Sequence, residues 1–381
     1  MKVRIVNTVE GFKALEPAWN ELHAQGVGAS FFNSFAFSFV WWQTYGVSGG
    51  SDQPHPLNVQ DGFVELSIFV IESDSNIVAI APLYKTKSQL AWLFKIPSLR
   101  FIGRGADIAP DDLDVMLCAD EAQALEAVRH LHMQWNELRW VQRILLEELP
   151  DRSRFFELSC QCDSYLIERR QSRPVAKLAV SWSEFTATLS RNTRKRIKAR
   201  RNRLNDAEGL SLSLCKDHVS MQQALSALIE LHKMRQSAKG ESPAFNTRHY
   251  IQFHENLVKA LHSIDGCQFI TLNDGEKIVG VEYLYCHNGC LLFYQTGFDP
   301  KYETVSPGHN MMVFAIENAI KNGFTDIDLL KGDYPYKQSY ANTKKESISA
   351  SIYFSVHWRL FAKTLNAVRW LIKFVKSKSS K

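Results

Sequence analysis

The residues best placed to do chemistry in this 381-residue chain are Ser306, Pro307 and Gly308, at the predicted start of a helix. A β-like apolar run at 291–294 precedes them, and apolar residues then recur at helical spacing up to a predicted stop at Gly323. Ser306 suits an N-cap, and Pro307 suits the first helical turn. The free N–H groups of a helix start bind phosphate, and Gly308 would let a bulky anion approach the backbone. A phosphate site is one interpretation of this stretch, and a simple helix cap is the other.

An earlier predicted helix carries a histidine on its apolar side. Met221, Leu225 and Leu228 share one helical stripe with His232, and Arg235 follows a turn later. His232 is therefore predicted to face inward. An inward histidine is usually a hydrogen-bonded core residue, and a catalytic role is the alternative.

A strongly basic run lies at residues 191–203, where eight of the thirteen residues are Lys or Arg and none is acidic. Leu189, Ile197 and Leu204 form a thin apolar stripe, which predicts a helix with a basic outer face. Three interpretations are open: a solvated face, a nucleic-acid patch, or a site for a phosphate-rich ligand. Base stacking needs interleaved aromatic residues, and this run has none, so only backbone contact with tRNA stays open.

Composition limits the class of protein. The length favours two domains, and 45% hydrophobic with 12% aromatic residues permits a large core. The net charge of +5 does not by itself imply nucleic acid. No uncharged run approaches the roughly 20 residues of a membrane span, and the N-terminus reads as a strand. Seven scattered cysteines suit a reducing cytoplasm, and their spacing is not that of a zinc site, so we expect free thiols and no metal.

Arg173-Pro174 marks a domain boundary. We expect an N-terminal lobe at 1–172, a C-terminal lobe at 173–356 and a terminal helix at 357–381. Residues 77–84 and 278–285 echo one another, since each follows a turn as the second arm of a hairpin. The echo predicts two copies of one α/β (α+β) fold, each a mixed central sheet flanked by helices.

Within the first lobe, residues 63–71 and 77–84 each read as one strand. The aromatic segment 31–45 is predicted to be a helix capped by Asn33 or Ser34, and it forms either core or the wall of a ligand groove. Residues 48–61 lack any pattern and read as a mobile loop.

The terminal segment 357–381 predicts an amphipathic basic helix. Its charges are all positive, and its apolar residues alternate at steps of three and four: Trp358, Phe361, Leu365, Val368, Ile372 and Val375. The helix either docks on the protein's own surface or binds an anionic membrane surface.

Six elements occur in order along the chain. They are the basic run at 191–204, Leu231-His232-x-x-Arg235, Asn273-Asp274-Gly275, Tyr294-x-x-Gly297-Phe298-Asp299-x-x-Tyr302, Ser306-Pro307-Gly308, and Asp326-x-Asp328-x-x-x-Gly332-x-x-x-Tyr336-Lys337. In this order they resemble the GNAT-fold acyltransferases of the CelD type, also called BioF2-like, which are relatives of the FemAB aminoacyl transferases. The resemblance is clear over residues 180–340 and consistent in layout over 1–170.

The resemblance implies two GNAT-like lobes and direct acyl transfer from acetyl-CoA or another acyl-CoA, without a covalent enzyme intermediate. The pantetheine would lie against the strand from Tyr294 to Gly297. The pyrophosphate would sit on the amides around Pro307 to Asn310, a turn that includes Gly308 and His309. The basic face would meet the 3′-phosphate of coenzyme A or an acidic glycan.

Such a transfer asks for a general base, a donor to the thioester carbonyl, and an acid for the departing thiolate. The candidates are His232 or Glu282 as base, Tyr336 or Lys337 as acid or substrate contact, and Arg235 and Asp328 as substrate contacts. Glu282 is an acid in an apolar strand, so burial would raise its pKa, although a paired structural carboxylate is the alternative. Asp328 either points into a cleft or pairs with Lys331.

Two departures from the wider family bear on the donor. The usual GNAT pyrophosphate loop, with a Gln or Arg and two glycines, is absent, and only Ser306-Pro307-Gly308 stands in for it. FemAB enzymes that act on peptidoglycan often carry a coiled-coil arm, and no such heptad pair occurs here, which favours acyl-CoA over aminoacyl-tRNA. We expect a cytoplasmic acyltransferase, either free or peripheral to the inner face of the membrane, whose acceptor is a sugar nucleotide, a lipid-linked sugar or an exopolysaccharide precursor. The alternatives are transfer from tRNA and a non-catalytic subunit of a polysaccharide assembly.

Overall fold

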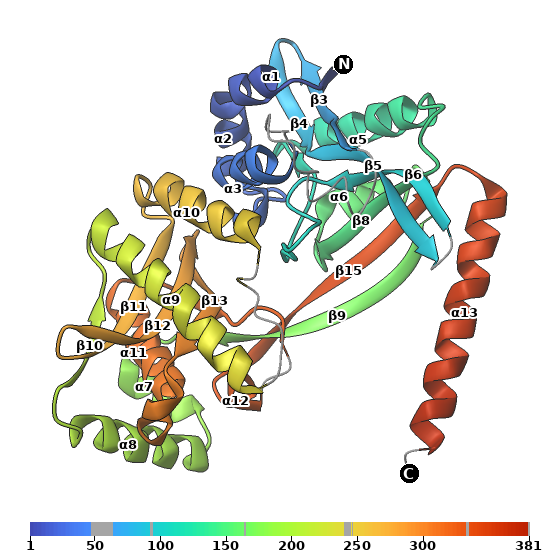
Figure 1. Cartoon of the computed structure of the whole chain (residues 1–381). Coiled ribbons are helices and arrows are strands. Elements are labelled where there is room, and N and C mark those ends of the chain that lie inside the picture. Colours follow the sequence, from blue (N-terminus) through green and yellow to red (C-terminus); the bar gives the residue numbers. More distant parts are fainter. Residues whose placement is uncertain are drawn as a thin grey trace. The chain divides into compact units, whose positions relative to one another are not determined.

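The computed structural model describes residues 1–46, 64–91, 94–163, 165–239, 245, 247–332 and 335–379, and the chain divides into two compact units. Unit 1 comprises residues 1–171 and 346–381, and unit 2 comprises residues 172–345. The chain passes between them twice, within the strands β9 (Leu166–Lys177) and β15 (Thr343–Tyr353) (Figure 1). Residues 346–356, which the sequence groups with the second lobe, therefore belong to unit 1.

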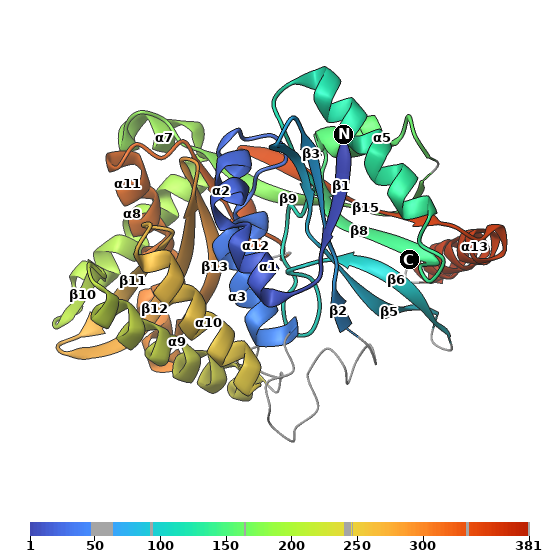
Figure 2. The same cartoon turned by 90° about the horizontal axis from the view of Figure 1, so that it is seen from above.

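Unit 1 holds two sheets with helices packed on them (Figure 2). One has the strand order β1-β3-β4-β7, and α5 packs on it; the other contains β15-β8-β6-β5-β2. The elements are β1 (Lys2–Val6), α1 (Val9–Ala14), α2 (Glu16–Ala24), η1 (Phe31–Asn33), α3 (Phe35–Trp41), η2 (Trp42–Gly46), β2 (Val64–Leu66), β3 (Ile68–Ser73), β4 (Asn76–Ala81), β5 (Leu83–Ala91), β6 (Phe94–Phe101), β7 (Met116–Leu117), α5 (Glu121–Asn136), β8 (Arg143–Pro150), α6 (Arg154–Ser159), part of β9, part of β15, and α13 (Val356–Ser379).

The first lobe's two predicted strands are each divided in the structure. Residues 77–84 contribute to β4 in one sheet and to β5 in the other, with Pro82 between them. Proline has no N–H to donate to a ladder, so a strand passes from one sheet to another readily at this position. Ser67 similarly separates β2 from β3. The prediction of single strands over 63–71 and 77–84 was therefore wrong.

The aromatic segment 31–45 forms core, as the simpler of its two interpretations predicted. Trp41 and Tyr45 are fully buried, and both lie close to other aromatic rings. The Ser34 side chain accepts a hydrogen bond from the N–H of Phe37, which confirms the predicted cap of α3. The predicted loop at 48–61 lies outside the described residues.

Unit 2 is built on a sheet of order β10-β11-β12-β13-β14-β9. Helices α9 and α10 cover one face, and α11 and α8 cover the other (Figure 2). The elements are α7 (Trp182–Thr188), α8 (Arg191–Asn205), β10 (Leu210–Leu214), α9 (His218–Lys239), α10 (Arg248–His262), β11 (Cys267–Asp274), β12 (Lys277–His287), β13 (Cys290–Phe298), η3 (Pro300–Val305), α11 (Pro307–Lys321), β14 (Asp326–Asp328) and α12 (Pro335–Gln338).

Local signals in unit 2 predicted several of these boundaries. Asn273-Asp274-Gly275 turns β11 into β12, and Gly275 has the positive φ of 57° that glycine tolerates. Gly323, with φ of 75°, follows the end of α11. In α8 the buried residues include Ile197 and Leu204, so the basic residues lie outward, as predicted.

Candidate active site

Strand β13 leaves its neighbour β14 after a short pairing. The two strands run parallel, and they pair over only three residues each, 290–292 and 326–328. β13 continues beyond this pairing to Phe298, and it carries a β-bulge at Tyr294 against β12. Bulges re-aim side chains next to functional sites, and a strand edge that is not paired presents main-chain N–H and C=O groups to a ligand. The predicted pantetheine position, from Tyr294 to Gly297, lies on this part of β13.

Helix α11 begins beside the same strand. Ser306 is the N-cap residue and Pro307 occupies the first turn, both as predicted. Ser306 lies in the left-handed region, with φ 54° and ψ 62°, and its side chain makes no capping hydrogen bond. A Cβ on Gly308 would lie 3.7 Å from Phe298 and 3.7 Å from Thr296, so the absence of a side chain opens space toward β13. The first N–H groups of α11 are therefore left for a ligand or for water.

Basic side chains from α8 surround this helix start. Arg200 donates to Nδ1 of His309 at 3.0 Å, and the hydroxyl of Tyr340 lies 2.7 Å from the same nitrogen. Arg196, one turn earlier, donates to Ser339 at 3.3 Å. Burial and these arginines lower the pKa of His309 to about 4, so the ring is neutral near pH 7. The helix dipole and the arginines together create an electropositive site.

Asn310 secures the helix start to its surroundings. Its side-chain amide donates to the carbonyl of Val305 at 2.7 Å and to that of Arg200 at 3.2 Å. The side chain is buried. Its contacts hold α11 and α8 together.

Glu282 lies on β12 directly opposite Thr296 of β13 and is fully buried. The Thr296 hydroxyl lies 2.8 Å from both carboxylate oxygens. Burial raises the pKa of Glu282 well above its usual value, and the Thr296 hydrogen bond and the charge of Lys337 oppose that rise. Because the methyl group of Thr296 faces the open space at Gly308, Glu282 is one side chain away from the start of α11.

Lys337 is also buried, although it lies on the short helix α12. Its ammonium donates to the carbonyls of Leu329 at 2.6 Å and Lys331 at 3.0 Å. A buried ammonium next to a buried carboxyl is the sort of pair that functional sites use to adjust proton affinity. Lys337 is therefore not a solvated surface lysine.

His232 is buried on α9, on the opposite face of the sheet from Glu282. A Cβ added at Gly297 would lie 3.3 Å from the backbone nitrogen of His232 and 3.0 Å from Leu228, so α9 packs directly on β13 there. The His232 ring lies 5.6 Å from that of Phe245. The structure therefore brings Gly297 and His232 together, and separates the two predicted bases by the thickness of the sheet.

Two residues that sequence reasoning missed complete this second face. The Tyr294 hydroxyl lies 3.0 Å from the hydroxyl of Tyr250 and 3.3 Å from Nε2 of His254. His254 is fully buried, and burial lowers its pKa to about 3. Tyr250 and His254 are four residues apart on α10, so their shared helical face was available as a signal in the sequence.

Asp328 is engaged within unit 2. Both of its oxygens lie 3.0 Å from Nε of Arg173, and Lys345 lies 3.3 Å from one of them. Asp328 and Arg173 are both buried, so this carboxylate pairs with Arg173 and supports the end of β14. Arg235 lies on α9 and Tyr336 on α12, but their side chains lie outside the described part of the structure.

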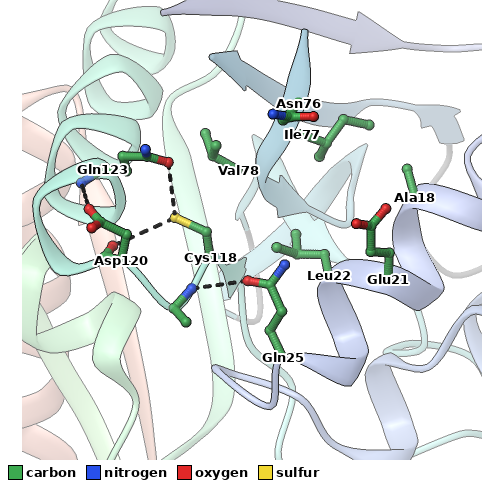
Figure 3. A pocket seen from close by; sticks show the side chains of 11 residues that line it. Ala18, Glu21, Leu22, Gln25, Asn76, Ile77, Val78, Cys118, Asp120 and Gln123 are labelled. Atoms are coloured by element: carbon green, nitrogen blue, oxygen red, sulfur yellow. Dashed lines mark hydrogen bonds between the residues drawn. The ribbon is translucent and has the colours of Figure 1, made fainter. Parts of the chain in front are cut away.

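Unit 1 has a separate cavity of about 350 Å³ between α2, β4 and the start of α5 (Figure 3). Cys118 is one of the residues that line it, and Gln25 accepts a hydrogen bond from the N–H of Ala119 at 3.1 Å. Glu21 and Asp120 line it, and its lining residues include no basic side chain. It is therefore unsuited to a pyrophosphate, unlike the helix start in unit 2. Among the described residues no His, Cys, Asp and Glu cluster could hold a metal ion, and all seven cysteines are free thiols.

Comparisons with known proteins agree with this geometry. A family model described as an acetyltransferase (GNAT) domain matches residues 191–338. The chain therefore contains a GNAT acetyltransferase domain, which makes it an acyltransferase. The matched residues include α8, the β13 bulge, the start of α11 and Lys337. A comparison with curated proteins found no match to the chain.

Solved structures show the wider fold. The chain is similar to FemX, with a TM-score of 0.61, 10% identity, and coverage of 95% of this chain and 100% of that one. It is similar to a conserved protein of unknown function from Bacteroides thetaiotaomicron, with a TM-score of 0.54, 13% identity, and coverage of 92% and 100%. It is also similar to the C-terminal domain of a putative lysylphosphatidylglycerol synthetase from Agrobacterium fabrum, with a TM-score of 0.52, 9% identity, and coverage of 94% and 96%. The fold is thus the FemX-like mixed α/β architecture over almost the whole chain.

Proposed function

We propose that this protein is an acyl-CoA-dependent N- or O-acyltransferase of the CelD, or BioF2-like, type. It acts on a sugar or polysaccharide precursor in bacterial exopolysaccharide or cell-envelope biosynthesis. The observation that carries the donor assignment is the uncapped start of α11, where Gly308 leaves space toward Thr296 and Arg200 adds positive charge. These features suit a pyrophosphate, which the backbone N–H groups and the arginines would bind together.

In the proposed reaction, an amine or hydroxyl of the acceptor attacks the thioester carbonyl. A C–N or C–O bond forms, the C–S bond breaks, and the coenzyme A thiolate takes up a proton. The raised pKa of Glu282 makes its ionised form a stronger base, and the Thr296 hydroxyl and Lys337 stabilise that form. The acceptor proton would pass to Glu282, and Tyr336 or Lys337 would protonate the thiolate. His232 is the second candidate for the base.

Aminoacyl transfer from tRNA is the second candidate function. The fold likeness to FemX and the exposed basic residues of α8 favour it. The free end of β13 favours acyl-CoA, because an extended pantetheine arm would add to that strand as a further β-like neighbour. A non-catalytic subunit is the remaining alternative, and it would retain its function when Glu282 or Lys337 is replaced.

Thermal unfolding of the full chain with acetyl-CoA tests the donor. A ligand that binds the folded state raises the melting temperature. We expect a clear rise for the native chain and none for Gly308→Leu, which fills the space next to Thr296. Lys321→Leu, at the exposed far end of α11, should keep the full rise. If neither acetyl-CoA nor longer acyl-CoAs raise the melting temperature of the native chain, while aminoacyl-tRNA does, the donor assignment is wrong.

A further inference from the structure

Helix α13 begins with a docked segment. Its first turns pack on unit 1 in a small apolar cluster consisting of Leu90, Ile96, Tyr353 and Ala362, with Trp358, Phe361 and Leu166 at the edge. Ala362 is 3% exposed, so this part of the helix is anchored. Docking on the protein's own surface, one of the two predicted interpretations, therefore accounts for residues 358–362 of a helix that continues to Ser379.

Large apolar side chains beside this anchor face solvent. Val356 is 69% exposed, Leu360 is 58% exposed and Val368 is 46% exposed. Phe94, at the start of β6, is 44% exposed, and its ring lies 5.7 Å from that of Phe361. Exposed apolar groups gathered around one helix are typical of an interaction surface.

The charge of the helix has one sign. Residues 356–381 contain no Asp or Glu, and their Lys and Arg residues are Arg359, Lys363, Arg369, Lys373, Lys376, Lys378 and Lys381. A helix that combines apolar residues with this excess of cations is complementary to an anionic lipid surface. Nucleic acid would match the charge but not the exposed Leu360 and Val368. No helix in the described part of the chain has the length and hydropathy to cross a bilayer.

We propose that α13 holds the protein on an anionic membrane surface. Residues 358–362 fix the helix to unit 1. The remainder lies in the plane of the interface, where apolar side chains enter the headgroup region and the basic residues pair with lipid phosphates. This inference does not depend on the acyl donor or the acceptor, because it concerns a helix outside the acetyltransferase domain.

Flotation of the full chain with lipid vesicles tests the proposal. We expect binding to vesicles that contain one-third phosphatidylglycerol in phosphatidylcholine, little binding to pure phosphatidylcholine, and weaker binding as salt rises from ~0.1 M to ~1 M, where screening is strong. A chain ending at residue 366 keeps the docked turns and should lose binding. Binding of this shortened chain equal to that of the full chain, or no binding by the full chain, overturns the proposal.

Two sets of variants separate the apolar and the charged contributions. Replacing Lys363, Lys373 and Lys376 by Gln should lower the partition coefficient by about 100-fold, since each cation near an anionic surface contributes roughly a fivefold factor. Leu360→Ser with Val368→Ser should also weaken binding. The matched control is Met133→Ser with Val219→Ser, which changes side chains of similar exposure on α5 and α9 and should leave binding intact.

The same apolar variants distinguish a membrane from a polyanion. If Leu360→Ser with Val368→Ser binds vesicles as well as the native chain does, and the chain binds RNA with an affinity that depends only on charge, the partner is nucleic acid and the membrane proposal is wrong.

Discussion

Each face of the unit 2 sheet buries an ionisable group, but the two groups differ in the partners that oppose the effect of burial. On the α11 face, Glu282 is buried with a hydroxyl and an ammonium that favour its charged form. On the α9 and α10 face, His254 is buried among aromatic rings, and burial alone lowers its pKa to about 3. Burial raises the pKa of Glu282 and lowers that of His254, so it favours the neutral form of both groups, and only for Glu282 do the partners named here shift the pKa the other way.

The bulge at Tyr294 determines which side chains of β13 point to each face of the sheet. The register between β12 and β13 shifts by one residue there, and side chains on either side of such a shift change the face to which they point. Thr296 then faces Glu282 and Gly308, whereas Tyr294 faces Tyr250 and His254. A thioester lying along this strand would have its proton acceptor on the α11 face and a hydrogen-bonded aromatic wall on the other.

The largest expected effect separates the two candidate bases. Glu282→Gln keeps the shape of the side chain but removes its proton affinity, so turnover should fall by about 10²–10³-fold. His232→Gln should lower turnover less, since His232 lies on the face of the sheet opposite to Gly308. Release of free coenzyme A thiol from acetyl-CoA, with a panel of amino sugars and sugar nucleotides as acceptors, measures both. A greater loss in His232→Gln would reverse the assignment.

The next effect concerns a charged pair that we regard as structural. Asp328→Asn leaves Arg173 buried without its full charge partner, and the free energy of opening of β14 should fall by about 3 kcal/mol. Hydrogen exchange of the β14 amides, followed by mass spectrometry, measures it. Glu317→Gln removes the partly exposed ion pair with Arg201, and should lower the free energy of unfolding by less than ~1 kcal/mol. A catalytic defect in Asp328→Asn without loss of protection would restore its role as a substrate contact.

A smaller effect is a pH dependence on the aromatic face. The pKa of His254 is lowered from 6.5 to about 3 in the folded protein, so the unfolded chain binds a proton first as the pH falls. This histidine's contribution to stability is complete above pH 6.5 and is lost as the pH falls toward 3. Below pH 6, the free energy of unfolding should fall by close to ~1.4 kcal/mol per pH unit because of this histidine. Hydrogen exchange of the β12 amides, corrected for intrinsic exchange, gives their free energy of opening between pH 6.5 and 5. This free energy should depend less on pH in His254→Gln than in His249→Gln. An equal pH dependence in the two variants would contradict the prediction.

The smallest effect tests the electropositive start of α11. Arg200→Gln should weaken acetyl-CoA binding by about tenfold, the usual scale for one charge-assisted contact. Lys198→Gln, which removes an exposed charge from another side of α8, should change the dissociation constant little. Isothermal titration calorimetry measures both, and equal effects would mean that the helix as a whole, and not Arg200, attracts the ligand.

Much of unit 2 could be predicted because its signals are local. The helix at Pro307, the Asn273-Asp274-Gly275 hairpin and the stop at Gly323 each depend on the conformational preferences of a few adjacent residues. The burial of Glu282 also followed from its apolar neighbours along β12. Such features need only short-range information.

The features that were missed depend on distant residues or on backbone geometry. Arg173 and Asp328 are 155 positions apart, and no pattern in either segment indicates the other. Pro82 separates β4 from β5, which belong to two different sheets. The local sequence does not show that these two strands pair in different sheets. Ser306 has a typical capping side chain but adopts a left-handed backbone, so the chemistry that suggested a cap is not used.

The twofold passage of the chain through β9 and β15 has a consequence for synthesis. Unit 2 is one continuous segment, whereas unit 1 needs residues 346–381 to complete the sheet that contains β8. On the ribosome, unit 2 therefore has its whole sequence available before unit 1 does, although it comes second along the chain. The edge of β8 stays unpaired until β15 has been synthesised. We therefore expect nascent chains of this protein to mispair mainly at this edge, and to need a chaperone there.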